Sequence, residues 1–432
     1  MDKYQQLLDF LHTLAPPTYK ENGREYQWSL ENMHRIDSFL GNPSKKIRCI
    51  HVAGTNGKGS TVSYLAALLI KAGYKIGYYR SPQMFDIRER FYINDNMIRP
   101  DEMVSFFEQI QAYLKAYNAS MLDTKGFLCS FSEFFVSLAF YFFAKNNVDF
   151  AIIETGIGGL NDPTNIIESP LLSIITSISY DHTGVLGNTL KQIAVQKCGI
   201  IKSQCPVLVG HINEQEVITT IHSYAQDLQS PCYFVDDWYN SLGNEERIEY
   251  DANADMAGEY QKFNLQTVSC ALHILKELID INLPFKEMQD AIKSTAHYTG
   301  LYGRWEIIST FPTIIADVAS NIMGMHLNFE QLEHIYQTGQ YSRLVLIFGI
   351  MGNDYVGIKK FLPRNAYYII AESRGYLSSR EIAEALNING YIATNVSDAI
   401  QHYKTIQQEK DLVYIGGSPL IVKEALIMSG MV

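Results

Sequence analysis

One segment of this 432-residue chain, residues 47–72, restricts the possible fold more than any other. It begins with the apolar, β-branched run Ile47–Ala53 and ends with apolar residues at helical spacing, which stop at Gly73. The residues between these runs are Gly54, Thr55, Asn56, Gly57, Lys58, Gly59, Ser60 and Thr61. The segment therefore predicts a buried strand, a glycine-rich loop and the N-terminus of a helix.

This loop has the chemistry of a phosphate-binding site. Glycines let backbone N–H groups approach phosphate oxygens, and the helix dipole favours negative charge there. We expect Lys58 to reach the β- and γ-phosphates of ATP and Ser60 or Thr61 to bind Mg²⁺. An ordinary glycine-rich turn is the alternative, but the flanking strand and helix favour the phosphate loop.

The composition excludes several classes of protein. The net charge of −11 argues against broad binding to nucleic acid or to anionic membranes. A hydrophobic content of 47% predicts a sizeable core, and the length allows two or three domains. The six cysteines contain no CxxC pair, which is typical of reduced thiols in a cytoplasmic protein. The most apolar run, residues 127–144, contains polar residues and is interpreted as a buried core helix.

Polar residues follow three further predicted strands. Ser81 comes after the strand Ile76–Tyr79, Glu154 ends an apolar strand from Asp149, and His182 follows the strand Leu172–Ile178. Ligands bind at the carboxyl ends of strands in open α/β sheets, where Mg²⁺ needs hard oxygen ligands. Taken alone, Ser81 is better interpreted as a turn residue before proline and His182 as a structural histidine. Glu154 has an exposed strand cap as its alternative, but the phosphate loop favours a metal role for it.

Strands alternate with helices along the whole chain, which predicts an α/β fold with mostly parallel sheets. We expect one domain over residues 1–298, including the N-terminal helices, and a second over 299–432. The acidic stretch 236–255 is interpreted as a surface insertion, with a β-hairpin as one possible form.

The motif Gly-Thr-Asn-Gly-Lys-Gly-Ser at residues 54–60 resembles the Mur ligase superfamily, within it the folylpolyglutamate synthase and dihydrofolate synthase branch. Later segments resemble that branch in the same order, so the resemblance extends over nearly the whole chain. It implies an N-terminal P-loop ATPase domain of the Mur ligase type and a smaller, Rossmann-like C-terminal domain.

The resemblance implies two Mg²⁺ sites. Ser81, Glu154 and His182 match metal ligands of the family, and Lys197 matches a lysine that is carbamylated there. Carbamylation would turn the Lys197 cation into a carboxylate that joins the second metal. From the residues alone, Lys197 is better interpreted as a helix-end lysine that pairs with backbone carbonyls.

The resemblance also assigns binding residues. Three match nucleotide contacts: Asn264 for adenine, Arg304 for phosphate and Asp317 for ribose. Asp162 matches an aspartate implicated in pterin contact, and Ser418 a serine near the amino-acid site.

Several positions depart from the family pattern. Gln83 and Ser320 stand where the family has histidines, Leu160 replaces an arginine, and Gln196 replaces a glutamate. The turn at 350–355 also lacks a lysine that the family carries. Most of these departures fall where the acceptor and the amino acid would bind.

The implied activity is ATP-dependent amide formation between L-glutamate and a pterin or folate carboxylate through an acyl phosphate. ATP and Mg²⁺ are the implied cofactors, with Lys58, Lys197, His182 and Arg304 as the catalytic set. We expect a cytoplasmic monomer with no nucleic-acid or membrane partner. Two alternatives stay open: a paralogue that ligates another carboxylate–amine pair, and a nucleotide-binding homologue without catalysis.

Overall fold

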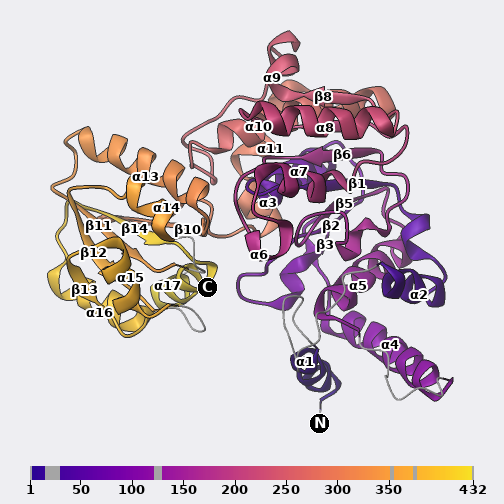
Figure 1. Ribbon diagram of the computed structural model, residues 1–432, viewed down its shortest axis with the longest axis horizontal. Coiled ribbons are helices and arrows are strands. Elements are labelled where there is room, and N and C mark those ends of the chain that lie inside the picture. The colour runs from indigo at the N-terminus through magenta and orange to yellow at the C-terminus, as the bar shows by residue number, and fades with distance from the viewer. Residues whose placement is uncertain (1, 15–29, 121–128, 351–354, 373–376, 431–432) are drawn as a thin grey trace. The chain divides into compact units, whose positions relative to one another are not determined.

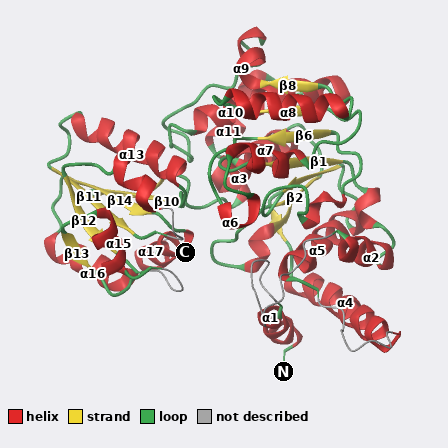
Figure 2. Cartoon of the chain, viewed as in Figure 1, coloured by secondary structure: helices red, strands yellow, loops and turns green. Residues whose placement is uncertain are grey.

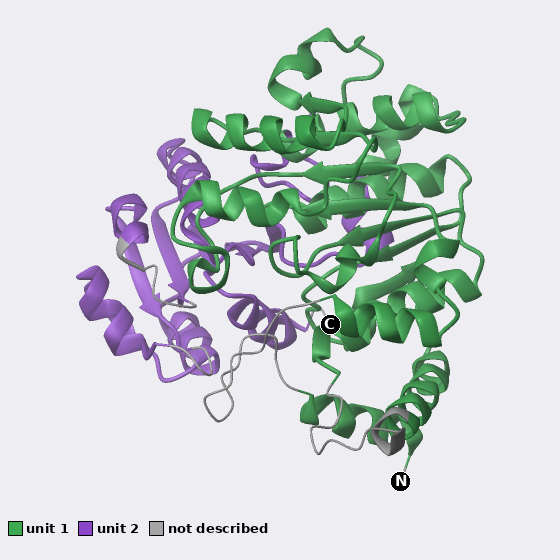
Figure 3. Ribbon diagram, turned by 45° about the vertical axis from the view of Figure 1, so that its right-hand side comes forward, with its two compact units in different colours: residues 1–248, 263–292 green, residues 249–262, 293–432 purple. Residues whose placement is uncertain are grey.

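A computed structural model describes residues 2–14, 30–120, 129–350, 355–372 and 377–430. The chain separates into two compact units (Figure 3). Unit 1 contains residues 1–248 and 263–292, and unit 2 contains residues 249–262 and 293–432. Each unit is an α/β structure, so the predicted fold class is confirmed.

Unit 1 is built on an eight-stranded sheet with strand order β4-β3-β2-β5-β1-β6-β7-β8 (Figure 1). The strands are β1 (Cys49–Ala53), β2 (Ile76–Tyr79), β3 (Phe91–Ile93), β4 (Asn96–Met97), β5 (Phe150–Glu154), β6 (Leu172–Ile175), β7 (Val207–Val209) and β8 (Cys232–Phe234). β1 pairs in parallel with both β5 and β6, and within the described part of this sheet only the β2–β3 and β3–β4 pairs are antiparallel. The carboxyl ends of β2, β5, β1 and β6 therefore meet at one edge of the sheet.

Helices surround this sheet (Figure 2). They are α1 (Lys3–Thr13), α2 (Glu31–Phe39), α3 (Lys58–Lys71), α4 (Pro100–Ser120), α5 (Phe131–Lys145), α6 (Thr183–Leu186), α7 (Leu190–Cys198), α8 (Gln215–Asp227), α9 (Val235–Trp238), α10 (Gln261–Leu278) and α11 (Phe285–Lys293). Short 3-10 turns are η1 (Pro43–Lys46), η2 (Ile87–Arg90), η3 (Pro163–Ile166) and η4 (Tyr239–Ser241). α3 packs on β1, β2 and β5 and buries most of its side chains.

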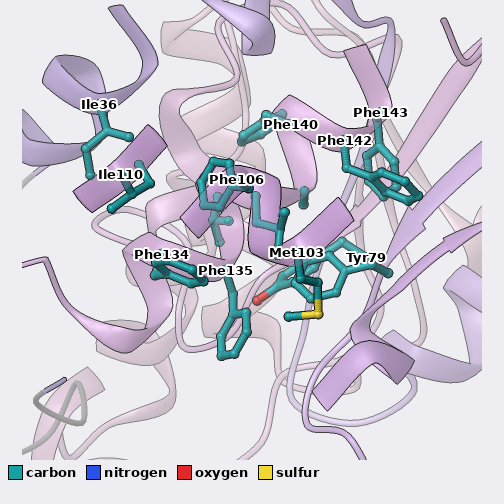
Figure 4. Packing of buried hydrophobic residues seen from close by; sticks show 14 of the residues in the cluster. Ile36, Tyr79, Met103, Phe106, Ile110, Phe134, Phe135, Phe140, Phe142 and Phe143 are labelled. Carbon is teal, nitrogen blue, oxygen red and sulfur yellow. The ribbon is translucent and has the colours of Figure 1, made fainter. Parts of the chain in front are cut away.

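A large apolar cluster of unit 1 lies around α5 (Figure 4). α5 begins with a capping box between Ser130 and Glu133, and its phenylalanines pack with side chains of α1, α2 and α4. The prediction of a buried core helix in this part of the chain is confirmed; residues 127 and 128 lie outside the described part. No described helix combines the length and hydropathy that crossing a bilayer requires.

Two segments in this part of the chain form less strand than their sequences suggest. The stretch 236–255 holds no hairpin: it forms α9, η4 and irregular turns, because Asp236 and Asp237 favour a helix start. Residues 88–90 belong to η2 rather than to a strand, because the Glu89 side chain accepts hydrogen bonds from three preceding backbone N–H groups.

Unit 2 is built on a six-stranded sheet with order β13-β12-β11-β14-β10-β9 (Figure 1). Its strands are β9 (Glu306–Thr310), β10 (Thr313–Asp317), β11 (Arg343–Phe348), β12 (Ala366–Ile370), β13 (Gly390–Ile392) and β14 (Asp411–Gly416). Its helices are α12 (Thr295–Thr299), α13 (Ile322–Gln337), α14 (Tyr355–Ile358), the 3-10 turn η5 (Lys359–Phe361), α15 (Ser379–Leu386), α16 (Val396–Ile406) and α17 (Pro419–Ser429). Only β9 pairs antiparallel within the described sheet. The carboxyl ends of β10, β14 and β11 are neighbours.

Candidate functional site

The glycine-rich loop joins the centre of the unit 1 sheet to α3, as predicted. Gly57 is the residue before α3 and has a φ of +86°, while Gly54 has a φ of +151°. A side-chain carbon at Gly54 would lie 1.9 Å from Thr176 Oγ1, and one at Gly57 would lie 2.2 Å from Asn264 Oδ1. Both positions therefore require glycine, because a larger residue would strain the backbone and displace its neighbour.

Hydroxyl groups that follow β6 hold this loop in place. The Asn56 N–H donates to Ser177 Oγ (3.0 Å), and the Thr176 hydroxyl donates to the Asn56 carbonyl (2.6 Å). The Thr55 N–H donates to the Ser177 carbonyl (2.9 Å). These supporting residues were not predicted, although the run Thr176-Ser177-Ile178-Ser179 at a strand end was a signal for them.

Two lysines converge on the same carbonyl of the loop. Lys58 Nζ donates to the carbonyl oxygens of Gly54 (3.0 Å) and Thr55 (3.1 Å), and Lys197 Nζ donates to that of Gly54 (2.7 Å). Lys197 comes from the last turn of α7 and is buried. Burial, with the nearby Lys58 charge, lowers the pKa of Lys197 to about 7.

The first turn of α3 carries the predicted hydroxyl ligands. Ser60 and Thr61 are both buried directly below the loop. Thr61 Oγ1 has no hydrogen-bond partner among the described residues, and its backbone N–H donates to the Gly57 carbonyl (2.8 Å).

Glu154 and Ser81 lie together at the ends of β5 and β2. The Ser81 N–H donates to Glu154 Oε2 (3.3 Å), and Glu154 is only 2% exposed. The register pairs Val52 of β1 with Glu154, so this carboxylate is one strand away from the phosphate loop. The structure thus brings together three of the predicted elements: the loop, the β5 carboxylate and the β2 serine.

His182 lies beyond β6, at the start of α6. It has a left-handed backbone with a φ of +48°, and its side chain is 48% exposed. Nε2 lies 3.8 Å from Asp181 Oδ1. Partial burial lowers the pKa of His182; Asp181 opposes this effect, whereas Lys58 and Lys197 add to it. The imidazole is therefore biased toward the neutral form that binds metals.

Asp162 organises the loop after β5. Oδ2 accepts from the N–H groups of Gly156 (2.8 Å) and Ile157 (3.0 Å), and Oδ1 accepts from the N–H of Thr164 (3.0 Å). Burial raises the pKa of Asp162, and these hydrogen bonds oppose that shift. The Thr164 hydroxyl also contacts His51 Nε2 (2.9 Å). Pterin contact by Asp162 stays a prediction.

Leu160 and Gln196, two residues that depart from the family pattern, contact each other through their backbones. The Leu160 N–H donates to the Gln196 carbonyl (2.7 Å), and the Leu160 carbonyl accepts from Asn165 Nδ2 (2.9 Å). These contacts join the loop after β5 to α7, and they do not depend on the identity of either side chain.

In unit 2, the carboxyl edge of the sheet carries the remaining predicted residues. Asp317 is buried and accepts from the Tyr260 hydroxyl (2.6 Å), the Trp305 N–H (2.8 Å) and the Ala319 N–H (2.8 Å). Arg304 is half-buried, and its Nη1 donates to the Gly303 carbonyl (3.3 Å).

Ser418 and Ser320 follow neighbouring strands, because the register pairs Asp317 of β10 with Gly416 of β14. Ser418 is buried, and its hydroxyl caps α17 by accepting from the Leu420 N–H (3.2 Å). Ser320 is half-buried. The turn that would carry the family lysine falls largely at 351–354, outside the described residues.

The donor set fits a magnesium ion better than a softer metal. Glu154, Ser81 and Ser60 offer hard oxygen ligands. Within the described ranges, no group of three histidine, cysteine, aspartate or glutamate residues is placed to hold a metal. A site of this kind would be completed by substrate phosphate oxygens and water, as is usual for Mg²⁺.

These features define an α/β protein of the P-loop type that is built to bind a nucleotide. The Mur ligase middle domain matches residues 52–275, and the Mur ligase glutamate ligase domain matches residues 303–419. The dihydrofolate synthase/folylpolyglutamate synthase of Bacillus subtilis is 30% identical over 414 residues, which cover 91% of this chain and 93% of that protein. The chain belongs to the Mur ligase family, in the branch of folylpolyglutamate and dihydrofolate synthases.

Solved structures share the fold. The folylpolyglutamate synthase of Mycobacterium tuberculosis complexed with ADP has a TM-score of 0.81 at 21% identity and covers 99% of this chain and 98% of that one. The bifunctional folylpolyglutamate synthase/dihydrofolate synthase of Yersinia pestis, complexed with AMPPNP and a Mn ion, has a TM-score of 0.81 at 24% identity, with 98% and 97% covered.

Proposed function

We propose that this protein is an ATP-dependent ligase that joins L-glutamate to the carboxylate of a pterin or folate through an acyl phosphate. The observation that carries this proposal is the meeting of Lys58 and Lys197 on the Gly54 carbonyl, one strand away from the buried Glu154. The name of the Bacillus subtilis relative supports this substrate class.

In this proposal, residues 54–61 hold the triphosphate of ATP. Backbone N–H groups at the start of α3 face the phosphates, and Lys58 moves from its carbonyl partners to the β- and γ-phosphates. Asn264, which is buried beside Gly57, contacts adenine. Arg304 and Asp317 of unit 2 contribute contacts to phosphate and ribose.

Glu154, Ser81, His182 and Ser60 would hold Mg²⁺, and Lys197 would join them at a second site after carbamylation. Bound magnesium would neutralise phosphate charge and polarise the γ-phosphoryl group. Carbamylation needs a neutral amine, because the nitrogen lone pair forms the new bond to CO₂ and one proton is released. A lysine with a pKa of about 7 supplies that amine near neutral pH.

The central difficulty of the reaction is the repulsion between an anionic acceptor carboxylate and the triphosphate. Lys58 and Arg304 lower this repulsion by screening charge on the transferring phosphoryl group. The carboxylate attacks the γ-phosphorus and ADP leaves. The amino group of glutamate then attacks the acyl phosphate carbonyl and releases phosphate. No side chain needs to form a covalent intermediate.

Two other functions compete with this one. The departures at Gln83 and Ser320 favour a ligase with a different carboxylate–amine pair, since both lie where the family binds its substrates. A homologue that binds nucleotide without catalysis is less consistent with this chain, because Lys58, Glu154 and Lys197 all persist.

The test is ADP release from ATP and Mg²⁺ with dihydropteroate or tetrahydrofolate in the presence of L-glutamate. We expect turnover that requires both the acceptor and glutamate. A protein that binds ATP but releases no ADP with either acceptor would overturn the folate assignment. Turnover with another carboxylate–amine pair would then identify the second candidate function. The proposal includes a cytoplasmic monomer with no nucleic-acid or membrane partner, which size-exclusion chromatography with light scattering tests in part.

A further inference from the structure

The positively charged side chain of Arg90 lies at the border of the apolar cluster around α5. It is the last residue of η2, immediately before β3, and it is half-buried. Its guanidinium lies over the rings of Phe131 and Phe135, with Cζ at 5.5 Å and 5.0 Å from the ring centroids. The flat group is therefore fixed against aromatic surface on one side.

Two hydrogen bonds orient this guanidinium. Arg90 Nε donates to Gln83 Oε1 (2.7 Å), and Nη1 makes a longer contact with the Tyr79 hydroxyl (3.4 Å). A guanidinium has five N–H donors, so three remain for another acceptor. They belong to the Nη1 and Nη2 edge, which matches a carboxylate in bidentate fashion.

The charge of Arg90 is not balanced by a carboxylate within the described residues. Arg88, two positions earlier in the same 3-10 turn, differs in this respect: its Nη2 lies 2.7 Å from Asp86 Oδ2, and its Nε donates to both oxygens of that carboxylate. The two arginines therefore form a natural comparison, with one neutralised by the protein and one left for a ligand.

The position of Arg90 relates it to the proposed reaction centre. The charges of Glu154, Asp162 and Arg90 all influence the pKa of Tyr79, although burial is the largest cause of its rise. In Figure 4 the Tyr79 hydroxyl points toward the Phe135 side of the cluster, where Arg90 lies. Gln83 is two residues after Ser81, whose N–H contacts Glu154.

The strand order separates Arg90 from the phosphate loop. From β3 the order runs through β2 and β5 to β1, which is three interstrand steps or about 14 Å. Glu154 lies between the two. Lys58 and Lys197 contact the loop itself, whereas Arg90 lies on the far side of Glu154 in the strand order.

We propose that Arg90 binds the carboxylate of the acceptor substrate, the group that attacks ATP, and that Gln83 positions Arg90 for this contact. This inference rests on the proposed ligase function and specifies how its acceptor is recognised. The ion pair brings the carboxylate past Glu154 toward the γ-phosphate while screening its charge. Gln83, one of the departures from the family pattern, thus becomes part of acceptor recognition.

The test compares Arg90→Met with Arg88→Met in the full-length protein. Methionine keeps the packing on Phe131 and Phe135 but removes the charge. We expect Arg90→Met to raise the KM for dihydropteroate or tetrahydrofolate by about 10- to 100-fold, the range of a lost hydrogen bond to a charged group. The KM for ATP should stay within about twofold of wild type, and Arg88→Met should leave both values near wild type.

A decarboxylated acceptor analogue identifies the group that Arg90 contacts. Its inhibition constant should be the same for the wild type and for Arg90→Met, because the analogue lacks the carboxylate. An equal loss for acceptor and analogue would overturn carboxylate recognition. A rise in the KM for ATP alone would assign Arg90 to phosphate and also overturn the proposal.

Gln83→Leu tests the positioning role. We expect a smaller rise in the acceptor KM than for Arg90→Met, with kcat retained. Gln83→Glu should also raise the acceptor KM, because a carboxylate beside Nε would neutralise Arg90 as Asp86 neutralises Arg88. If Gln83→Leu behaves like wild type, the positioning role is wrong. If the wild-type protein releases no ADP, the ligase proposal fails, and calorimetric binding of the acceptors with AMPPNP still decides whether Arg90 recognises a carboxylate.

Discussion

The two units contain sheets that both gather buried polar residues at their carboxyl edges, but these residues are satisfied in different ways. In unit 1, Lys58 and Lys197 donate to the Gly54 carbonyl, and neither forms an ion pair with a carboxylate in the described part of the chain. In unit 2, Asp317 accepts three hydrogen bonds from its own unit. Uncompensated charge beside a phosphate loop is typical of a site that awaits a ligand.

The carboxyl ends of the strands therefore have different roles in the two sheets, although both sheets are of the α/β type. The edge of unit 1 keeps the buried Lys197 beside the half-buried Lys58. Burying this charge costs stability, and a triphosphate would neutralise it. The edge of unit 2 uses Asp317 and Ser418 to hold strands and a helix start together.

Replacing Lys58 should have the largest effect. Lys58→Met removes the charge that faces the β- and γ-phosphates, so ATP-dependent turnover should fall by about 10³-fold. Lys71→Met, at the exposed end of the same helix, is the matched control and should retain activity. Steady-state ADP release measures both; an active Lys58→Met would remove the phosphate loop from the mechanism.

Lys197→Met should reduce turnover by about 10²-fold, because it removes the carbamate that would bind the second metal. Depleting CO₂ and bicarbonate should lower wild-type activity, and adding bicarbonate should restore it, while the variant should not respond. Turnover that is independent of bicarbonate in the wild type would show that Lys197 acts as an amine rather than as a carbamate.

In unit 2, Asp317→Asn should destabilise the fold by about 2–3 kcal/mol, since an amide nitrogen would face donors that now meet a carboxylate. Tyr260→Phe removes one of the three hydrogen bonds and should cost about 1 kcal/mol. Hydrogen exchange of the β10 and β14 amides measures both. Unchanged protection together with a raised KM for ATP would mean that Asp317 serves only the nucleotide.

The pH dependence of stability should also distinguish unit 1. Burial lowers the pKa of Lys197 from 10.5 to about 7, so the folded state binds fewer protons than the unfolded state between these values. Stability therefore rises with pH across this window. In CO₂-free buffer at pH 7, the free energy of unfolding of Lys197→Met should be about 2 kcal/mol higher than that of the wild type. This difference should shrink toward pH 10.5. A constant difference would contradict the burial of an uncompensated amine.

The smallest effect belongs to Ser418→Ala, which removes the cap of α17 and should cost about 1 kcal/mol. Ser418→Thr keeps the hydroxyl and is the control. Thermal unfolding measures both. A large loss of affinity for glutamate without a loss of stability would show instead that Ser418 belongs to the amino-acid site.

The sequence was most informative where local pattern and position in the sheet agree. Residues 47–72 contain their own strand, turn and helix signals, so β1, the loop and α3 were all predicted. The strand ends with Ser81 and Glu154 were also predicted, because parallel strands place such residues at one edge. The helix α4 was not predicted, although its buried residues Met103, Phe106, Phe107 and Ile110 stand at helical spacing.

Contacts between distant parts of the chain were beyond sequence reasoning. The need for glycine at position 57 comes from Asn264, more than two hundred residues later, and the bracing of the loop comes from Thr176. Gln83 was recognised only as a departure from the family, because its hydrogen bond to Arg90 depends on how η2 folds back. The stretch 236–255, for which a hairpin was one possible form, has turns that are set by local side chains rather than by strand pairing.

The division of the chain has a consequence for its synthesis. Unit 1 contains residues 263–292 as well as 1–248, and the intervening 249–262 belong to unit 2. Domains generally fold as units while the ribosome is still adding residues. Here the first 248 residues cannot complete unit 1 until α10 is synthesised, because α10 brings Asn264 to the phosphate loop. By that point the ribosome has already added residues 249–262, which belong to unit 2. A gene fragment that ends at residue 248 or at residue 262 would therefore encode the phosphate loop without Asn264.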